Sequence, residues 1–248
     1  MSYYATNKML TPSKIKKYLK SPNYFYKRYV TEEIGEEFSP AFAIGAAVDC
    51  WLTEGKVVFD NKYICVGRRN IKNPPVGIVE LNNTQWEEVT GLSEAVERTT
   101  AFKDLIGYNC QQTIATPITG NFTLLAGRPD WYKIVDNTCI IVDLKTAEKV
   151  EAIKHHWDCI SYGYYFSQAV YQYILKQLHP EITRFISRHI VVGKERYVNP
   201  VKTFLLSQQM IDSIKETLPE LIQEISTRDN FDKEDTKWED QEEIGDQV

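Results

Sequence analysis

The residues best suited to catalysis are two acids and a lysine that flank a predicted strand. Asp130 ends a Gly-Arg-Pro-Asp run, and after twelve further residues Asp143 and Lys145 follow an apolar stretch. Side chains two positions apart on a strand point to the same face, so Asp143 and Lys145 share one site. If the two strands pair through the turn at Asp136-Asn137, Asp130 lies beside Asp143 at one end of the sheet.

These groups permit two interpretations. In the first, the carboxylates of Asp130 and Asp143 and the backbone carbonyl of Leu144 form an oxygen-rich site that suits Mg²⁺ or Mn²⁺. Lys145 then positions or activates a water for attack on a phosphodiester. In the second, Asp143 and Lys145 form a buried structural ion pair, and Asp130 is a turn residue. Buried charges must be paired or bind a metal, and both interpretations meet this condition.

Residue spacing predicts the helices that surround these residues. Thr11-Pro12 and Ser21-Pro22 each place a capping hydroxyl before a proline, which predicts two short helices within residues 11–30. Further helical segments are expected over Ala41–Glu54, which Gly55 closes, and over Thr84–Leu105, Glu148–Leu178 and Ser207–Thr227.

Short β-prone runs separated by turn residues predict the strands. They cover Thr113–Ile118, Phe122–Ala126, Trp131–Val135, Cys139–Lys145 and Phe185–Val192. We expect the first four to form an antiparallel meander, and residues 56–82 to be irregular with short strands. Strands bracketed by helices indicate an α/β fold with a central mixed sheet flanked by helices.

The formal net charge of −5 hides opposite charges at the two ends of the chain. Residues 1–30 carry +7 and no acid, whereas residues 229–248 carry −7, which leaves +2 on residues 1–228. The lysines of the opening segment alternate with aromatics, which suits a nucleic-acid backbone and its bases; a solvated lysine face over core aromatics is the alternative. We expect residues 1–228 to form a single domain and residues 229–248 to be an acidic, disordered or loosely docked tail.

The chain is 43% hydrophobic and 25% charged, as in soluble proteins. Its longest apolar stretch is too short for a bilayer, and its first residues lack a signal-peptide core, so we expect a cytoplasmic protein without membrane association. The five cysteines show no CxxC pair and no Cys/His ligand spacing, so they are expected to be small buried apolar residues. His155 and His156 are expected at a solvated helix start, and His189 in a strand as a packing residue.

Several motifs occur in an order that resembles the PD-(D/E)XK nuclease superfamily, in its RecB-like and RecE-like exonuclease branch. They are Gly-Arg-Pro-Asp, Ile-Val-Asp-Leu-Lys-Thr, and Tyr162-Gly163-Tyr164 leading to Gln168 and Tyr171. The opening helices and the run Gly45–Asp49 also resemble elements of that family. The resemblance implies a restriction-endonuclease-like core.

The resemblance also assigns roles to single residues. Asp130 and Asp143 would be metal ligands, with Leu144 through its carbonyl, and Lys145 the catalytic lysine. Gln168 would orient the lysine or the attacking water, with Tyr171 as its companion. Apart from the resemblance, we expect the DNA contacts to come from Lys14, Lys17, Lys20, Arg28 and Arg128.

Three departures from the family pattern matter. Asp49 stands where the family has a metal-binding histidine, which favours magnesium. Gln111 and Gln112 occupy the region of a frequent glutamate, so a second metal is expected to be held weakly. Relatives with an iron–sulfur cluster have a cysteine at the position of Ser21 and more near the C-terminus, so no such cluster is expected here.

The implied function is a Mg²⁺-dependent deoxyribonuclease, with Mn²⁺ as a substitute, that acts as an exonuclease on DNA ends in recombination or repair. The expected setting is a bacterial or phage-infected cell. A single-strand annealing protein and further copies of the chain, arranged as a ring, are the expected partners. The alternatives are a catalytically silent DNA-end-binding module of the same fold and a structure-specific endonuclease.

Overall fold

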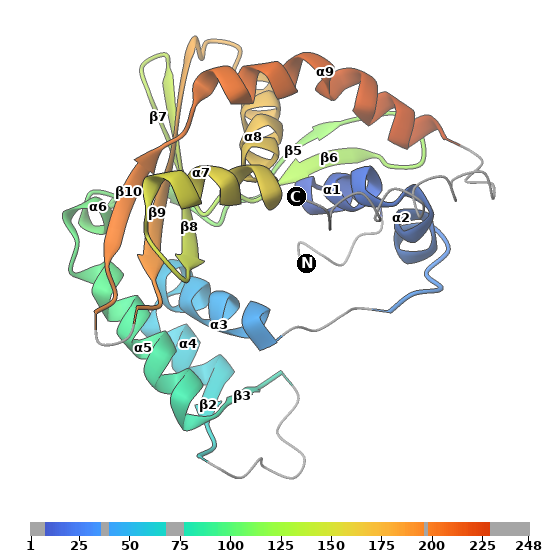
Figure 1. The fold of residues 1–248 in the computed structure, drawn as a ribbon. Coiled ribbons are helices and arrows are strands. Elements are labelled where there is room, and N and C mark those ends of the chain that lie inside the picture. Colours follow the sequence, from blue (N-terminus) through green and yellow to red (C-terminus); the bar gives the residue numbers. More distant parts are fainter. Residues whose placement is uncertain (1–7, 36–39, 68–76, 196–197, 229–248) are drawn as a thin grey trace, which may run out of the picture.

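The computed structural model describes residues 8–35, 40–67, 77–195 and 198–228 (Figure 1). The helices are α1 (Pro12–Lys20), α2 (Pro22–Tyr29), α3 (Pro40–Asp49), α4 (Lys56–Lys62), α5 (Asn83–Glu97), α6 (Thr100–Lys103), α7 (Ala152–Ser161), α8 (Tyr164–Leu178) and α9 (Gln208–Thr227). A π-helical turn, η1 (Cys50–Glu54), continues α3. The strands are β1 (Met9–Leu10), β2 (Tyr63–Cys65), β3 (Val79–Leu81), β4 (Asn109–Cys110), β5 (Ile114–Pro117), β6 (Leu124–Gly127), β7 (Trp131–Val135), β8 (Thr138–Ala147), β9 (Arg184–Gly193) and β10 (Val201–Leu205).

The central sheet is mixed, which confirms the expected α/β class. Its strand order is β10-β9-β8-β7-β4, with β8 and β9 parallel and the other pairs antiparallel. A smaller sheet has the order β1-β6-β5, and β2 pairs with β3. Among the described residues, no helix has the length and apolar character to cross a membrane.

Alternating side chains of β8 face two different cores. Val142 and Leu144 pack into the cluster that includes α3, α4 and α5, whereas Cys139 and Ile141 pack into the cluster that includes α1, α8 and α9. Figure 1 shows these two groups of helices at opposite ends of the molecule. Because strand side chains alternate, Asp143 continues the series that faces α8.

The caps predicted for the opening helices are confirmed. The hydroxyls of Thr11 and Ser21 accept hydrogen bonds from the backbone N–H groups of Lys14 and Tyr24, at 3.4 and 3.2 Å. The next residue in each case is a proline at the first helical position, where its missing N–H leaves no helical hydrogen bond unmade.

The predicted four-stranded meander is wrong in one respect. β6 pairs with β5 in the smaller sheet, and β7 pairs with β8 in the central sheet, so the chain changes sheets between Gly127 and Trp131. Pro129 lies at this change, and a proline has no N–H with which to continue a strand ladder. The change of sheet places Asp130 at the end of the central sheet.

Three other segments differ from the prediction. Residues 56–82 include helix α4 besides the short strands β2 and β3. Strand β10 was not predicted, because as an edge strand it is largely exposed and lacks a clear apolar alternation. The helical segment Glu148–Leu178 is two helices, divided at Gly163, whose φ of 63° suits glycine.

Candidate active site

The two predicted acids lie side by side at one end of the central sheet. Trp131 pairs with Val142, so the preceding Asp130 is the neighbour of Asp143. The backbone N–H of Asp130 donates to Oδ1 of Asp143 at 3.4 Å, and the backbone N–H of Leu144 donates to Oδ2 of Asp130 at 2.7 Å. The strand pairing expected from the sequence therefore produces this juxtaposition.

Lys145 lies beside Asp143 on the same strand face, as the two-residue spacing predicts. Its Nζ lies 3.4 Å from Oδ2 of Asp143 and donates to the carbonyl oxygen of Leu144 at 3.0 Å. The ammonium also lies 5.0 Å from the centre of the Tyr164 ring. The ion pair of the structural interpretation is thus present, within a cluster that holds further carboxylates.

Asp49 brings a third carboxylate from the opposite side of the site. It is the last residue of α3, at the point where the helix widens into the π-turn η1. Such turns are frequent at functional sites. The side-chain amide of Gln111 donates to both carboxylate oxygens of Asp49 and to Oδ1 of Asp130, each at 3.2 Å. Gln111 therefore joins Asp49 to the acids of the sheet.

The sequence indicated Gln111 only as the occupant of a glutamate position, and its contacts are a finding of the structure. Its backbone φ is 50°, in the left-handed region that residues with a side chain adopt rarely. This conformation follows strand β4 and directs the amide to the carboxylates. Backbone strain of this kind collects at functional sites.

The three carboxyl groups have shifted pKa values. Burial, followed by the charges of Asp143 and Asp49, raises the pKa of Asp130 well above its ordinary value. Burial raises the pKa of Asp49 to about 6, against the lowering effect of Lys145 and Arg128. Burial alone would also raise the pKa of Asp143, but Lys145 and His189 outweigh it, so this pKa is lowered. Of the three acids, Asp130 therefore has the pKa that burial and the neighbouring carboxylates raise most strongly.

The donor set fits a hard divalent cation. Three carboxylates and the Leu144 carbonyl offer oxygen ligands, which Mg²⁺ and Mn²⁺ prefer to nitrogen or sulfur. The raised pKa of Asp130 shows that its negative charge lacks full compensation from the residues around it. A cation held by Asp49, Asp130 and Asp143 would supply that compensation.

Gln168 and Tyr171 come from α8. Gln168 is fully buried, and neither its amide nitrogen nor its amide oxygen has a hydrogen-bond partner among the described residues, so the structure does not join it to Lys145 as the resemblance suggested. Tyr171 packs against Gly127, where an added Cβ would lie 2.6 Å from the ring. Gly127 therefore allows α8 to approach the chain just before Asp130.

The predicted DNA contacts differ in their availability. Lys17 and Lys20 are exposed on α1, and Arg128 is half-buried close enough to Asp49 to lower its pKa. Arg28 is half-buried and donates to the carbonyl of Ile34 at 2.7 Å.

The structure corrects the expectation that Lys14 contacts DNA. This lysine is buried, and its Nζ donates to the carbonyl of Met9 at 2.8 Å, so it supports the fold and is not available to a phosphate.

Lys16 is a basic residue of the site that sequence reasoning did not select. Its Nζ donates to the carbonyl of Tyr162 at 3.1 Å and to the hydroxyl of Ser167 at 3.3 Å. Burial, and then the charge of Lys145, lower the pKa of Lys16 to about 8. The spacing of Lys16 from Lys20 in the sequence did not mark Lys16 as a site residue, because its contacts depend on the packing of α1 against the start of α8.

The chain belongs to the family described as PDDEXK-like domain of unknown function (DUF3799), which it matches over residues 11–239. This membership confirms the superfamily that the motifs indicated. No curated protein matches the chain.

A solved structure shares this fold. A protein described as a "Putative exonuclease" from Eubacterium rectale has a TM-score of 0.63 and 14% identity, covering 91% of this chain and 85% of its own. A phage related exonuclease from Haemophilus somnus 129PT has a TM-score of 0.31 and 11% identity, covering 77% and 88%. The TM-score of the second is too low to carry an argument, and the first shows the fold alone.

Proposed function

We propose that this protein is a Mg²⁺-dependent deoxyribonuclease that removes nucleotides from DNA ends, in recombination or repair. The observation that carries the proposal is the hydrogen-bonded cluster of Asp49, Asp130 and Asp143 beside Lys145. The PDDEXK-like family and the exonuclease description of the Eubacterium rectale protein support the same class of reaction.

The residues divide the work of phosphodiester hydrolysis. A bound divalent cation would supply Lewis acidity and a more acidic water. Asp130, Asp143 and the Leu144 carbonyl would hold it from the sheet, and Asp49 would hold it from α3. Lys145, with its pKa raised chiefly by Asp143 against the effect of burial, remains an ammonium that orients the attacking water and stabilises negative charge on the phosphoryl oxygens.

Basic residues around the cluster would receive the DNA backbone. Arg128 follows β6 at the edge of the cluster, and Lys16 reaches toward it from α1. Lys17 and Lys20 extend the positive charge along the exposed face of α1. The buried amide of Gln168, which has no hydrogen-bond partner among the described residues, could bind an internal water.

A substrate panel tests the proposal. Wild-type protein is incubated with Mg²⁺ and either linear end-labelled duplex, single-stranded DNA or closed circular duplex. We expect short products from a linear substrate and none from the circle. Cleavage of the circle would show an endonuclease, and binding of ends without Mg²⁺-dependent products would show a silent binding module.

Two variants test whether cleavage depends on the site. Asp143→Asn and Lys145→Ala should each abolish product formation while the circular dichroism spectrum is retained. Asp60→Asn is the matched control, since Asp60 pairs with Lys56 at 2.8 Å on the exposed face of α4. Cleavage by Asp143→Asn at the wild-type rate would overturn the assignment.

A further inference from the structure

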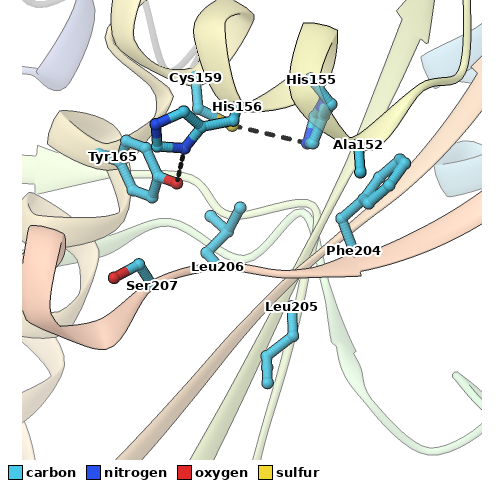
Figure 2. A pocket seen from close by; sticks show the side chains of 9 residues that line it. All are labelled: Ala152, His155, His156, Cys159, Tyr165, Phe204, Leu205, Leu206 and Ser207. Carbon is cyan, nitrogen blue, oxygen red and sulfur yellow. Dashed lines mark hydrogen bonds between the residues drawn. The ribbon is translucent and has the colours of Figure 1, made fainter.

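A second set of potential metal ligands lies beneath α7. His155 and Cys159 are one helical turn apart on α7, and His189 comes from β9. All three side chains are buried, at 4%, 0% and 0% exposure. Figure 2 shows His155 and Cys159 at the wall of a pocket that Phe204 and Leu206 also line. The expectation of a solvated His155 is therefore wrong, although His156 is exposed.

The three ligand atoms have the separations of a metal centre. Nε2 of His155 lies 3.1 Å from Nδ1 of His189 and 3.5 Å from Sγ of Cys159, and Sγ lies 4.0 Å from Nδ1 of His189. Tetrahedral zinc with Zn–N near 2.0 Å and Zn–S near 2.3 Å requires N–N separations of about 3.3 Å and N–S separations of about 3.6 Å. The observed triangle matches these values to within about 0.4 Å.

We propose that His155, Cys159 and His189 bind one Zn²⁺ ion, at a site chemically distinct from the oxygen-rich acidic cluster. Imidazole and thiolate are the ligands that zinc prefers, whereas Mg²⁺ prefers oxygen. The adjoining cavity, of about 400 Å³, is lined by His155 and Cys159 and would give the ion an entry path and room for a water as its fourth ligand.

A purely structural contact explains less of the geometry. A hydrogen bond between the two imidazoles accounts for the 3.1 Å separation, but it gives no reason for Cys159 to converge on the same two nitrogens. Burial lowers the pKa of both histidines, which favours the neutral form that binds a metal, and raises the pKa of Cys159 to about 12, so the thiol would release its proton when the ion binds.

The location gives the ion a structural role. His189 is the register partner of Asp143 on the neighbouring parallel strand. A metal held by His189 and α7 would therefore fasten α7 to the strand next to the acidic cluster. This inference does not depend on the proposed nuclease activity.

Metal content and spectroscopy test the proposal. Purified full-length protein is stripped with a chelator, titrated with Co²⁺ as a spectroscopic probe, and then with Zn²⁺. We expect one Co²⁺ per chain with a thiolate-to-cobalt charge-transfer band, displaced by equimolar Zn²⁺ and not by millimolar Mg²⁺. Zn²⁺ should also raise the melting temperature.

Matched variants locate the ion. Cys159→Ala should lose the band, whereas Cys50→Ala, which also removes a buried sulfur, should keep it. His155→Gln should lose tight Co²⁺ binding, and His156→Gln should keep it. Asp143→Asn should leave the band intact. The proposal would be overturned if wild-type protein lacks the band or if Cys159→Ala keeps it. It would also be overturned if Asp143→Asn loses the band while Cys159→Ala does not.

The sequence contained a signal for this site. The expectation of no Cys/His ligand spacing is wrong here, because His155 and Cys159 are four residues apart, which on a helix places them on one face. The third ligand, His189, lies on a strand thirty residues later in the chain, and only the packing of α7 on β9 brings it to them.

Discussion

Asp130 and Asp143 lie in one site, joined by a hydrogen bond, yet their pKa values are shifted in opposite directions. The difference arises from Lys145, which pairs with Asp143 at 3.4 Å and lies on its strand. Within the part of the chain that the structure describes, Asp130 has no ion pair of this kind, and its chief partners are the amide of Gln111 and the N–H of Leu144. The two acids should therefore respond differently to neutralisation.

Neutralising the two acids should change stability with opposite signs in metal-free buffer. Asp130→Asn removes repulsion and should stabilise the protein by about 1 kcal/mol. Asp143→Asn leaves the largely buried Lys145 without its partner and should destabilise it by about 1–3 kcal/mol. Urea unfolding in the presence of EDTA measures both, and shifts of the same sign in the two variants would contradict this account.

The requirement for Mg²⁺ should depend on pH through Asp49. With a pKa of about 6, Asp49 binds a proton below that pH and must lose it to bind a cation. The Mg²⁺ concentration for half-maximal cleavage should therefore rise by about tenfold for each pH unit below about 6, and more steeply if Asp130 also takes up a proton. Asp49→Asn should flatten this dependence and raise the Mg²⁺ requirement at pH 8. An identical pH profile in the variant would show that Asp49 does not bind the metal.

Metal-free stability should also fall with rising pH. Asp49 and Asp130 have raised pKa values in the folded state, so the folded protein holds their protons more tightly than the unfolded chain does. Stability is then lost as pH rises from about 4, the ordinary value for aspartate, through the folded-state pKa values. Saturating Mg²⁺ should reverse this loss at pH 7 to 8. Thermal melts with and without Mg²⁺ between pH 4 and pH 8 measure the effect.

Gln111 offers a gain-of-binding test. Gln111→Glu adds a carboxylate at a position that already contacts Asp49 and Asp130 at 3.2 Å. The variant should be less stable without metal because a further like charge enters the site, and it should need several-fold less Mg²⁺ for cleavage. Gln112→Glu is the control, since Gln112 is exposed and accepts a hydrogen bond from Tyr132. Equal effects from the two substitutions would contradict the role of Gln111.

The sequence was sufficient for the parts of the site that depend on local geometry. Strand alternation placed Asp143 and Lys145 on one face, and a short turn brought Asp130 to them. Gln111 and Lys16 could not be found in this way, because one depends on an unusual backbone angle and the other on helix packing. The change of sheet at Pro129 was missed because each flanking strand has an ordinary pattern.

Charge alone was a poor guide to DNA contacts. Lys14 and Lys17 are equivalent in a count of basic residues, yet only Lys17 is exposed. Lys14 is directed to the interior by the helical turn, where it lies over the rings of Tyr29 and Phe122.

The two cysteines Cys65 and Cys110 are exposed, contrary to the expectation that all five cysteines are buried.

The lysines of α1 should separate into two classes. Lys17→Ala and Lys20→Ala should each weaken DNA binding and reduce the slope of log K against log salt by about 1. Lys14→Ala should leave that slope unchanged and lower the melting temperature, since its hydrogen bond to Met9 and its ring contacts are lost. Salt titrations of binding with a catalytically inactive background measure the slopes. A reduced slope in Lys14→Ala would show that Lys14 contacts DNA.

The acidic segment 229–248 should compete with DNA. The segment, expected from the sequence to be a disordered or loosely docked tail, lies outside the described residues, and the last described residue, Arg228, donates to the hydroxyl of Tyr18 on α1 at 2.7 Å. Removal of its charge of −7 should strengthen DNA binding, most clearly in dilute buffer, because screening acts over about 8–10 Å near physiological salt. Superimposable binding curves for full-length and truncated protein at low salt would show that the segment does not compete.

Anomalous scattering from a manganese-soaked crystal tests whether Asp49, Asp130 and Asp143 hold the cation that we propose for DNA hydrolysis. We predict a manganese peak about 2.0–2.3 Å from carboxylate oxygens of Asp130 and Asp143 and from the Leu144 carbonyl, with Asp49 as a direct or water-mediated ligand. The same crystal of Asp143→Asn should lose the peak. A wild-type crystal with no peak among these carboxylates, at a manganese concentration that supports DNA cleavage in solution, would contradict the proposal.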